Sequence, residues 1–240
     1  MPQSEIAIVG AGLVGAGWAI VFARAGRRVR IFDASSETRA AFLGNVATAL
    51  AAMQRHGLVD DPDAVVARMS VVGSVAEAVS GAAYVQESVF ETIPVKQAVS
   101  LEIDAAIGPD TVVGSSTSGF PASTFTEGCA NRARFLVAHP VNPPHLVPVV
   151  ELVPAPWTAP EAVATTRALM DEVGQTPVTV NREIDGFILN RLQGAILDEA
   201  FSLYAQGYAS AADIDATISR GLGLRWSFMG PFETIELNAP

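Results

Sequence analysis

The segment over residues 5–15, "EIAIVGAGLVG", restricts the possible folds more than any other part of the chain. It places a short apolar strand directly before the pattern G-x-G-x-x-G, and a helix of small residues follows. Gly10 allows a tight turn, Gly12 lets a pyrophosphate approach the backbone, and Gly15 lets the helix pack closely on the strand. We therefore expect a strand–turn–helix unit that binds the phosphates of a dinucleotide.

The chain beyond this segment alternates short apolar strands with amphipathic helices as far as about residue 181. Such alternation is typical of a parallel sheet with helices on both faces. We therefore predict the α/β class, with a doubly wound, Rossmann-type sheet. Its strands are expected near residues 5–10, 29–33, 70–74, 82–88, 111–116, 134–139, 148–153 and 177–180.

The periodicity changes after this sheet, where apolar side chains such as Phe187 and Leu192 recur on one face of a long helix. A second helix is expected behind it, capped by Ser210. The chain is therefore predicted to contain a dinucleotide-binding domain over residues 1–183 and a smaller, all-helical domain over residues 184–240.

Composition narrows the range of functions. The formal net charge of −10 argues against nucleic acid as a partner, because phosphate backbones need a basic surface. No apolar run reaches the ~18 residues that span a bilayer, and no basic segment precedes the first apolar run, so we expect a cytoplasmic protein without a membrane partner. Cys129 is the only cysteine of the chain, so an internal disulfide is excluded. The sequence also lacks the clusters of His and Cys that bind metal ions, so we expect no metal site.

Asp33 is expected at the end of the second strand, 18 residues after Gly15. A carboxylate at this place accepts hydrogen bonds from an adenosine ribose and repels a 2′-phosphate. The sequence therefore favours NAD over NADP as the cofactor.

The stretch "AHPVNPPHLVPVVELV" contains an imidazole and a carboxylate within two apolar strands. His139 ends one strand on the carboxyl side of the sheet, where ligands bind in doubly wound folds. Glu151 interrupts the next strand, where an unpaired carboxylate is costly. If the strands are neighbours, Glu151 can orient the imidazole and stabilise its protonated form. Because a bound dinucleotide suggests hydride transfer, we expect His139 to take the proton of the substrate; a purely structural histidine is the alternative.

Five motifs resemble, in order and over nearly the whole chain, those of the 3-hydroxyacyl-CoA dehydrogenase family: "VGAGLVGAGWA", "SSTSGF", "AHPVNPPHLVPVVELV", "DGFILNRLQGAILDEA" and "GLGLRWSFMGPFE". The third and the fifth are most similar to the branch that contains L-gulonate 3-dehydrogenase. The resemblance implies that His139 is the general base in alcohol oxidation, with Glu151 as its partner. It also implies that Ser118 and Asn190 hydrogen-bond the reacting oxygen and that Asn142 positions the nicotinamide or the substrate.

The same resemblance implies which residues contact the cofactor. Lys96, the only lysine of the chain, would lie near the nicotinamide ribose, and a solvated place on a helix surface is the alternative. The residues implied in NAD binding are Gly10, Gly12, Leu13, Val14, Gly15, Asp33, Glu91, Lys96 and Asn142.

One departure from the family pattern bears on the substrate. The helix after the second strand contains "GNVATALAAMQRHG", which has no lysine and one arginine near its end, so a multiply charged coenzyme A meets little complementary charge. We therefore expect oxidation of a small free 3-hydroxy acid such as L-gulonate. Arg225 is expected either to bind the substrate carboxylate or to lie exposed at a helix end.

Three alternatives stay open beside this expectation. The first is an L-3-hydroxyacyl-CoA dehydrogenase that acts on 3-hydroxybutyryl-CoA. The second is L-carnitine as the substrate, since Trp226 or Phe228 could face a quaternary ammonium group. The third is a crystallin-like nucleotide-binding protein without enzymatic activity.

A second departure lies at the carboxyl end, where the sequence reads "ELNAP" and the family pattern implies several more helices. The helical domain is therefore expected to be shortened relative to the family. Because those helices help to form the family dimer, the expectation of a homodimer depends on them.

Overall fold

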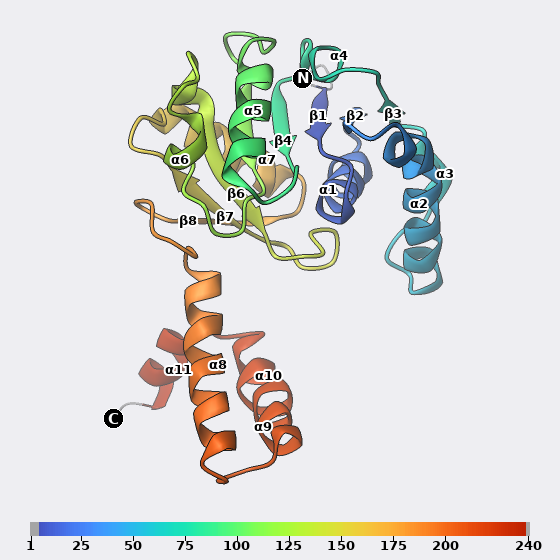
Figure 1. The fold of residues 1–240 in the computed structure, drawn as a ribbon. Helices are drawn as coiled ribbons and strands as arrows, with labels where there is room; N and C mark the ends of the chain where they lie inside the picture. The colour runs from blue at the N-terminus through green and yellow to red at the C-terminus, as the bar shows by residue number, and fades with distance from the viewer. Residues whose placement is uncertain (1–4, 239–240) are drawn as a thin grey trace. The chain divides into compact units, whose positions relative to one another are not determined.

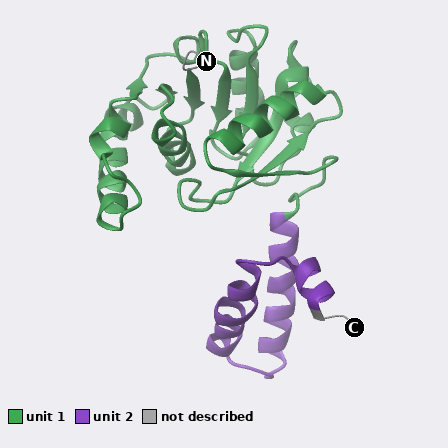
Figure 2. Cartoon of the chain, turned by 180° about the vertical axis from the view of Figure 1, so that it is seen from behind, with its two compact units in different colours: residues 1–188 green, residues 189–240 purple. Residues whose placement is uncertain are grey.

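The computed structural model describes residues 5–238, and the chain divides into two compact units, residues 1–188 and 189–240 (Figure 2). The first unit holds a sheet with its covering helices, and the second unit holds helices alone. Among the described residues, no helix is both long and apolar enough to cross a membrane.

The first unit is built on the strands β1 (Ile6–Val9), β2 (Val29–Phe32), β3 (Met69–Val71), β4 (Tyr84–Glu87), β5 (Val112–Ser115), β6 (Phe135–Pro140), β7 (Val149–Pro154) and β8 (Thr176–Thr179). They form one eight-stranded sheet in the order β3-β2-β1-β4-β5-β6-β7-β8 (Figure 1). Strands β1 to β6 all run parallel to one another. The predicted α/β class with a doubly wound, Rossmann-type sheet is confirmed.

Strand β7 departs from the parallel arrangement. It pairs antiparallel with β6, and β8 pairs parallel with β7, so the last two strands run against the first six. The physical reason is the short connection over residues 141–148, since a parallel pair needs a crossover of about a dozen residues or more. The sheet is thus parallel, as expected, over β1 to β6, and only the pair β6–β7 is antiparallel.

Helices cover both faces of this sheet. They are α1 (Leu13–Arg24), α2 (Ser36–Arg55), α3 (Pro62–Val66), α4 (Val75–Val79), α5 (Ile93–Asp104), α6 (Ser123–Thr126), the short 3-10 helix η1 (Arg132–Arg134) and α7 (Pro160–Glu172). One face packs against α1, α2, α3 and α7, with Trp18 and Phe22 fully buried between the layers. The other face packs against α4 and α5, around Val79 and Ile103. The core therefore lies on both sides of the sheet and holds its strand ends in fixed positions.

The second unit consists of α8 (Leu189–Ala205), α9 (Ala211–Thr217), the π-helical turn η2 (Ile218–Leu222), α10 (Gly223–Trp226) and α11 (Pro231–Asn238). The prediction of a helical carboxyl-terminal region is confirmed. Ser210 caps α9 as expected, because its Oγ accepts the Asp213 amide at 3.2 Å.

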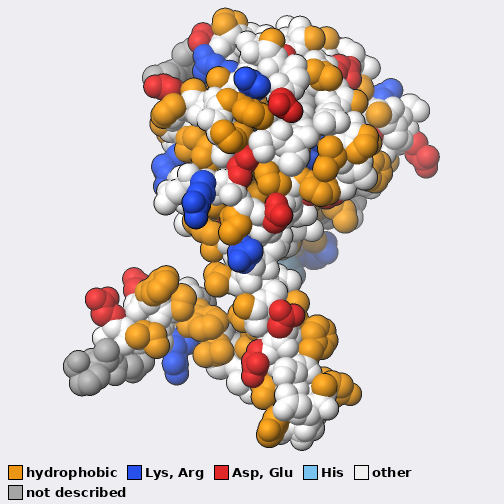
Figure 3. Space-filling model, turned by 60° about the vertical axis from the view of Figure 1, so that its left-hand side comes forward, with side chains coloured by type: hydrophobic (Ala, Val, Ile, Leu, Met, Phe, Trp, Pro, Cys, Tyr) orange, Lys and Arg blue, Asp and Glu red, His pale blue; other side chains and the backbone are white. Residues whose placement is uncertain are grey.

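The helices of the second unit keep large apolar side chains in contact with water. None of the apolar side chains that the structure describes in this unit is buried. Tyr208 is 73% exposed and Phe232 is 90% exposed. Hydrophobic side chains are accordingly visible on its surface in Figure 3.

A substitution at Gly15 tests how closely α1 approaches the turn before it. A Cβ on Gly15 would lie 1.9 Å from the backbone oxygen of Gly10, so a side chain there must displace the helix or the turn. We expect Gly15→Ala to lower the free energy of unfolding by about 1–3 kcal/mol, measured by urea denaturation.

Gly44→Ala is the matched control for this substitution. Gly44 lies exposed in α2, and a Cβ there would meet no atom within 4 Å. The control should raise the free energy of unfolding by about 0.5–1 kcal/mol through helix propensity alone. Equal effects of the two substitutions would contradict the close packing of α1 on the turn.

Candidate active site

Polar side chains gather where the parallel strands end. In sheet order, Asp33 follows β2, Gly10 follows β1, Glu87 ends β4, Ser115 ends β5 and His139 lies near the end of β6. The register of the strands keeps these positions along one edge of the sheet. Ligands bind along this edge in doubly wound folds, so it is the candidate active site.

The turn after β1 has the conformation that the glycine pattern requires. Gly10 has a φ of +102°, and a Cβ on it would lie 2.5 Å from the backbone carbonyl of Ser88. The amide of Gly10 donates to the Phe32 carbonyl at 2.8 Å. Asp33 also holds the turn, because its Oδ2 accepts the Ala11 amide at 2.8 Å. This carboxylate therefore fixes the turn and still offers lone pairs to a ligand.

The start of α1 fits a pyrophosphate group. A Cβ on Gly12 would meet no atom within 4 Å, so the space beside this backbone is open to a ligand. Gly12 is the N-cap of α1, and no side-chain cap occupies the first amides of the helix. Leu13 is 86% exposed here, whereas Val14 packs against the core. These residues could hold the diphosphate of NAD.

Two residues that face each other on β6 and β7 form a buried pair. His139 and Glu151 are register partners of the antiparallel strands, so their side chains lie on the same face of the sheet. His139 Nδ1 lies 2.8 Å from Glu151 Oε2, and the two residues are 6% and 2% exposed. The condition in the sequence analysis, that the two strands are neighbours, is met.

The hydrogen bonds of Glu151 set the tautomer of the imidazole. Glu151 Oε1 accepts the Ile188 amide at 2.8 Å, while Oε2 faces His139 Nδ1. A carboxylate that accepts on both oxygens requires the hydrogen of a neutral imidazole to be on Nδ1. Nε2 then presents its lone pair, and none of the described residues forms a hydrogen bond with it. His139 is therefore arranged to take a proton at Nε2.

The segment before α8 supports this pair, although no sequence pattern predicted it. Gly186 and Phe187 have successive positive φ angles of 72° and 52°, and Phe187 is fully buried. A left-handed conformation is unfavourable for an aromatic residue. It places the Phe187 ring 5.5 Å from the His139 ring, next to the Ile188 amide that binds Glu151. The expected place of Phe187 on a helix face was wrong, because helical periodicity does not reveal a left-handed turn.

Lys96 lies between a buried carboxylate, Glu87, and an exposed one, Glu91, in what we call the Glu87–Lys96–Glu91 cluster. Lys96 Nζ is 3.1 and 3.2 Å from the two carboxylate oxygens of Glu87 and 3.2 Å from Glu91 Oε2. Lys96 and Glu87 are each 1% exposed, so the alternative of a solvated lysine was wrong. The ammonium also lies 5.9 Å from the centre of the Phe125 ring.

Glu91 joins this cluster to the loop after β5. Its Oε1 accepts the Thr117 hydroxyl at 2.6 Å and the Ser118 amide at 2.8 Å. Burial alone would raise the pKa of Glu91, but the Thr117 hydroxyl, the nearby ammonium and the Ser118 amide together lower it. Ser118 keeps an exposed side chain in this loop, so its hydroxyl could reach a substrate.

Two adjacent polar residues of β4 were not found by the sequence analysis. Glu87 accepts the Val89 amide at 2.7 Å and also the Ser115 hydroxyl. Gln86 points to the other face and donates to Ser116 Oγ at 2.7 Å. A signal was present, since both residues interrupt an apolar strand, where buried polar groups need partners.

The remaining predicted site residues belong to other segments. Asn142 is exposed in the connection between β6 and β7. Asn190 and Arg225 belong to the second unit, where Asn190 is half-buried in the first turn of α8 and Arg225 is exposed on α10. Within the first unit, the predicted residues that hydrogen-bond or ion-pair with one another are His139 with Glu151, and Glu91 with Lys96 and Ser118.

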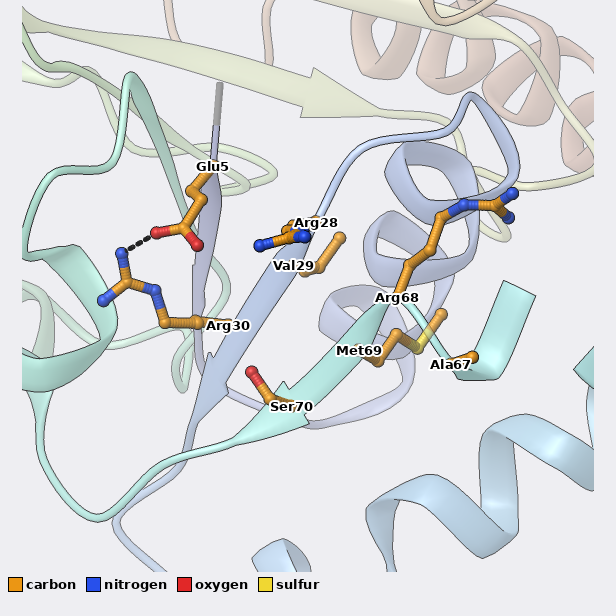
Figure 4. Close-up of a pocket in the computed structure, with 8 residues that line it drawn as sticks. All are labelled: Glu5, Arg28, Val29, Arg30, Ala67, Arg68, Met69 and Ser70. Carbon is orange, nitrogen blue, oxygen red and sulfur yellow. Dashed lines mark hydrogen bonds and ion pairs between the residues drawn. The ribbon is translucent and has the colours of Figure 1, made fainter. Parts of the chain in front are cut away.

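A hollow of about 460 Å³ lies away from this edge (Figure 4). It is found at the amino ends of β1, β2 and β3, beside Glu5, Arg28 and Arg68, which precede these strands. Arg30 forms an ion pair with Glu5 there and also binds two backbone carbonyls. The hollow is therefore at the end of the parallel strands opposite to His139.

Comparison with known proteins agrees with this arrangement. The family model described as "3-hydroxyacyl-CoA dehydrogenase, NAD binding domain" matches residues 5–184, and the C-terminal domain model of the same family matches residues 186–240. Lambda-crystallin of Oryctolagus cuniculus is 41% identical over 238 residues, which cover 98% of this chain and 75% of the relative. L-carnitine dehydrogenase of Streptomyces griseus is 39% identical over 233 residues, which cover 97% of this chain and 69% of the relative.

Solved structures give the same result. The structure of FHMPC 5-dehydrogenase, described as an NAD+ dependent dismutase, has a TM-score of 0.88 at 32% identity, covering 100% of this chain and 77% of its own. Since the two family models together match nearly the whole chain, the protein belongs to the 3-hydroxyacyl-CoA dehydrogenase family and is an NAD-dependent dehydrogenase.

Proposed function

We propose that this dehydrogenase oxidises the hydroxyl group of a small 3-hydroxy acid of the L-gulonate type, with His139 as the general base. The observation that carries the proposal is the buried hydrogen bond of 2.8 Å between His139 Nδ1 and Glu151 Oε2. It leaves Nε2 as the proton acceptor on the edge of the sheet where ligands bind.

The proton of the substrate hydroxyl moves to His139 Nε2 during oxidation and returns from it during reduction. Glu151 stabilises the imidazolium that forms, since an unpaired buried cation is unfavourable. NAD, when bound, supplies the nicotinamide that accepts a hydride from the carbon bearing the hydroxyl. Ser118 and Asn190 donate hydrogen bonds to the reacting oxygen, and Asn142 positions the substrate or the nicotinamide.

The residues that hold the cofactor in this proposal follow the edge of the sheet. The turn over residues 10–15 takes the diphosphate, where the backbone at Gly12 is open. Asp33 accepts the adenosine ribose hydroxyls, since each of its oxygens already accepts one backbone amide and keeps another lone pair. Glu91 and Lys96 lie beside the nicotinamide ribose.

The charge distribution supports a small substrate over a coenzyme A ester. Helix α2 has Arg55 as the basic residue of its last turn, and the eleven residues over 44–54 have no Lys or Arg. The phosphates of coenzyme A would find few partners there. Arg225, exposed on α10, can bind a carboxylate through two parallel hydrogen bonds. The similarity to L-carnitine dehydrogenase adds L-carnitine to the candidate substrates.

Replacement of His139 tests the proton transfer. We expect His139→Asn to lower kcat by about 100- to 10,000-fold, because general acid–base catalysis contributes about this much. His56→Asn is the matched control, since His56 is exposed at the carboxyl end of α2. The kcat of this control variant should equal that of the wild type. The measurement is the initial rate of NADH formation, together with NADH binding to each variant.

Equal kcat values for the two histidine variants would remove His139 from the mechanism. Loss of NADH binding in His139→Asn would mean that the substitution acts through the fold or the cofactor site. Retained binding with lost turnover is the result that supports a general base.

A substrate panel tests the substrate class. We expect the highest kcat/KM for a free hydroxy acid with NAD, among L-gulonate, L-carnitine, 3-hydroxybutyrate and 3-hydroxybutyryl-CoA, each assayed with NAD and NADP. Arg225→Gln should raise KM for the free acid by about tenfold or more, as expected for a lost hydrogen-bonded ion pair. Activity on the coenzyme A ester alone would overturn the substrate class. NADH binding without any turnover would favour a crystallin-like role, which the similarity to lambda-crystallin also suggests.

We also propose that the chain forms a homodimer through its second unit. Exposed side chains there, among them Phe201, Tyr208 and Phe232, would leave water in such an assembly. Sedimentation velocity of the 240-residue chain should give the mass of a dimer at micromolar concentration. A monomer throughout the concentration range would contradict this proposal.

A further inference from the structure

The Glu87–Lys96–Glu91 cluster carries more negative than positive charge. Both oxygens of Glu87 receive hydrogen bonds from groups that can only donate, since the Val89 amide binds Oε1 and the Lys96 ammonium reaches both. Glu91 likewise accepts the Ser118 amide on Oε1 and the ammonium on Oε2. Donors thus surround both carboxyl groups, as they surround ionised carboxylates. Two carboxylates and one ammonium leave the cluster with one net negative charge.

The surrounding residues do little to neutralise this charge. Lys96 is the only lysine of the chain, and no arginine among the described residues forms an ion pair with Glu87 or Glu91. Asp33 and His139 add no positive charge to this edge while the imidazole is neutral. Because Glu87 is 1% exposed, water and salt screen its charge less than they would at the surface.

We propose that Glu87 raises the affinity of the cofactor site for the oxidised nicotinamide relative to the reduced one. The oxidised ring carries a positive charge and the reduced ring is neutral, whereas the rest of the dinucleotide is the same. A net negative charge beside the nicotinamide ribose therefore stabilises the oxidised form selectively. This inference rests on the proposed function, in which Glu91 and Lys96 lie beside that ribose.

Glu87 acts as a positioning residue in this inference. It contacts the Lys96 ammonium, the Val89 amide and the Ser115 hydroxyl, whereas the Glu91 side chain is 39% exposed and can reach a ligand. Without the charge of Glu87, Lys96 and Glu91 would form a neutral pair. The preference for the oxidised ring thus depends on a carboxylate that lies behind the ligand-binding surface.

Separate dissociation constants for NAD+ and NADH, measured on the full chain by isothermal titration calorimetry, test the inference. Glu87→Gln keeps the shape of the side chain and removes its charge. We expect the ratio of the NAD+ constant to the NADH constant to rise by roughly three- to tenfold, the order expected for one partly screened charge near a cation. Contacts with the ribose, the diphosphate and the adenine are common to both forms, so the ratio isolates the charge.

Ser115→Ala is the matched control, because it removes a hydrogen bond to the same carboxylate without changing the charge. Its ratio should stay within about twofold of the wild type. Glu91→Gln removes the other carboxylate charge, and it keeps the test available if Glu87→Gln does not fold. The ratio should rise to a similar extent in that variant. An unchanged ratio in the folded carboxylate variants overturns the inference.

Failure of this inference and failure of the proposed function give different results. If the wild type oxidises a hydroxy acid but the ratio does not respond to Glu87→Gln, the charge effect alone is refuted. If the ratio rises but no hydroxy acid is oxidised, the inference stands and the proposed oxidation fails. If neither dinucleotide binds to the wild type, both are refuted.

Discussion

The hydrogen bond between His139 and Glu151 depends on one reversal of chain direction. Because β7 runs antiparallel to β6 after a short connection, the two residues face each other at the carboxyl edge of the parallel strands. A crossover helix in place of that connection would start β7 at the opposite edge, and Glu151 would then lie at a different level from His139. The contact between His139 and Glu151 is therefore set by the topology of the sheet as much as by their residue types.

The carboxylates along this edge are satisfied by donors that the strands and turns already hold in place. Asp33 accepts two backbone amides, Glu151 accepts an amide and faces an imidazole, and Glu87 accepts an ammonium, an amide and a hydroxyl. The two buried carboxylates, Glu87 and Glu151, would be strongly destabilising without these partners. The charged groups of this edge are thus held in place before any ligand binds.

The parts of this architecture that the sequence predicts are those that local patterns encode. The glycine turn and the strand–helix alternation involve residues close in the chain, and they were sufficient for the fold and for NAD. The contact between His139 and Glu151 was predictable only on the condition that two strands pair, since strand register depends on the whole sheet. Lys96 was assigned by resemblance, but its partner Glu87 was missed, although a carboxyl group within an apolar strand indicates buried donors. The pairing itself depends on how α5 folds back against β4. Phe187 was missed because a left-handed backbone has no signature in apolar periodicity.

Strand β4 connects the two faces of the sheet at the candidate active site. Gln86 and Glu87 are adjacent, so their side chains point to opposite faces. Gln86 donates to Ser116 Oγ, which also accepts the indole N–H of Trp18 from α1 at 3.1 Å. Glu87 accepts the Ser115 hydroxyl on the other face. The end of β5 and the loop after it are therefore held by hydrogen bonds on both faces of the sheet. Ser116 is linked to Trp18 of α1, and Ser115 is linked through Glu87 to the Lys96 ammonium.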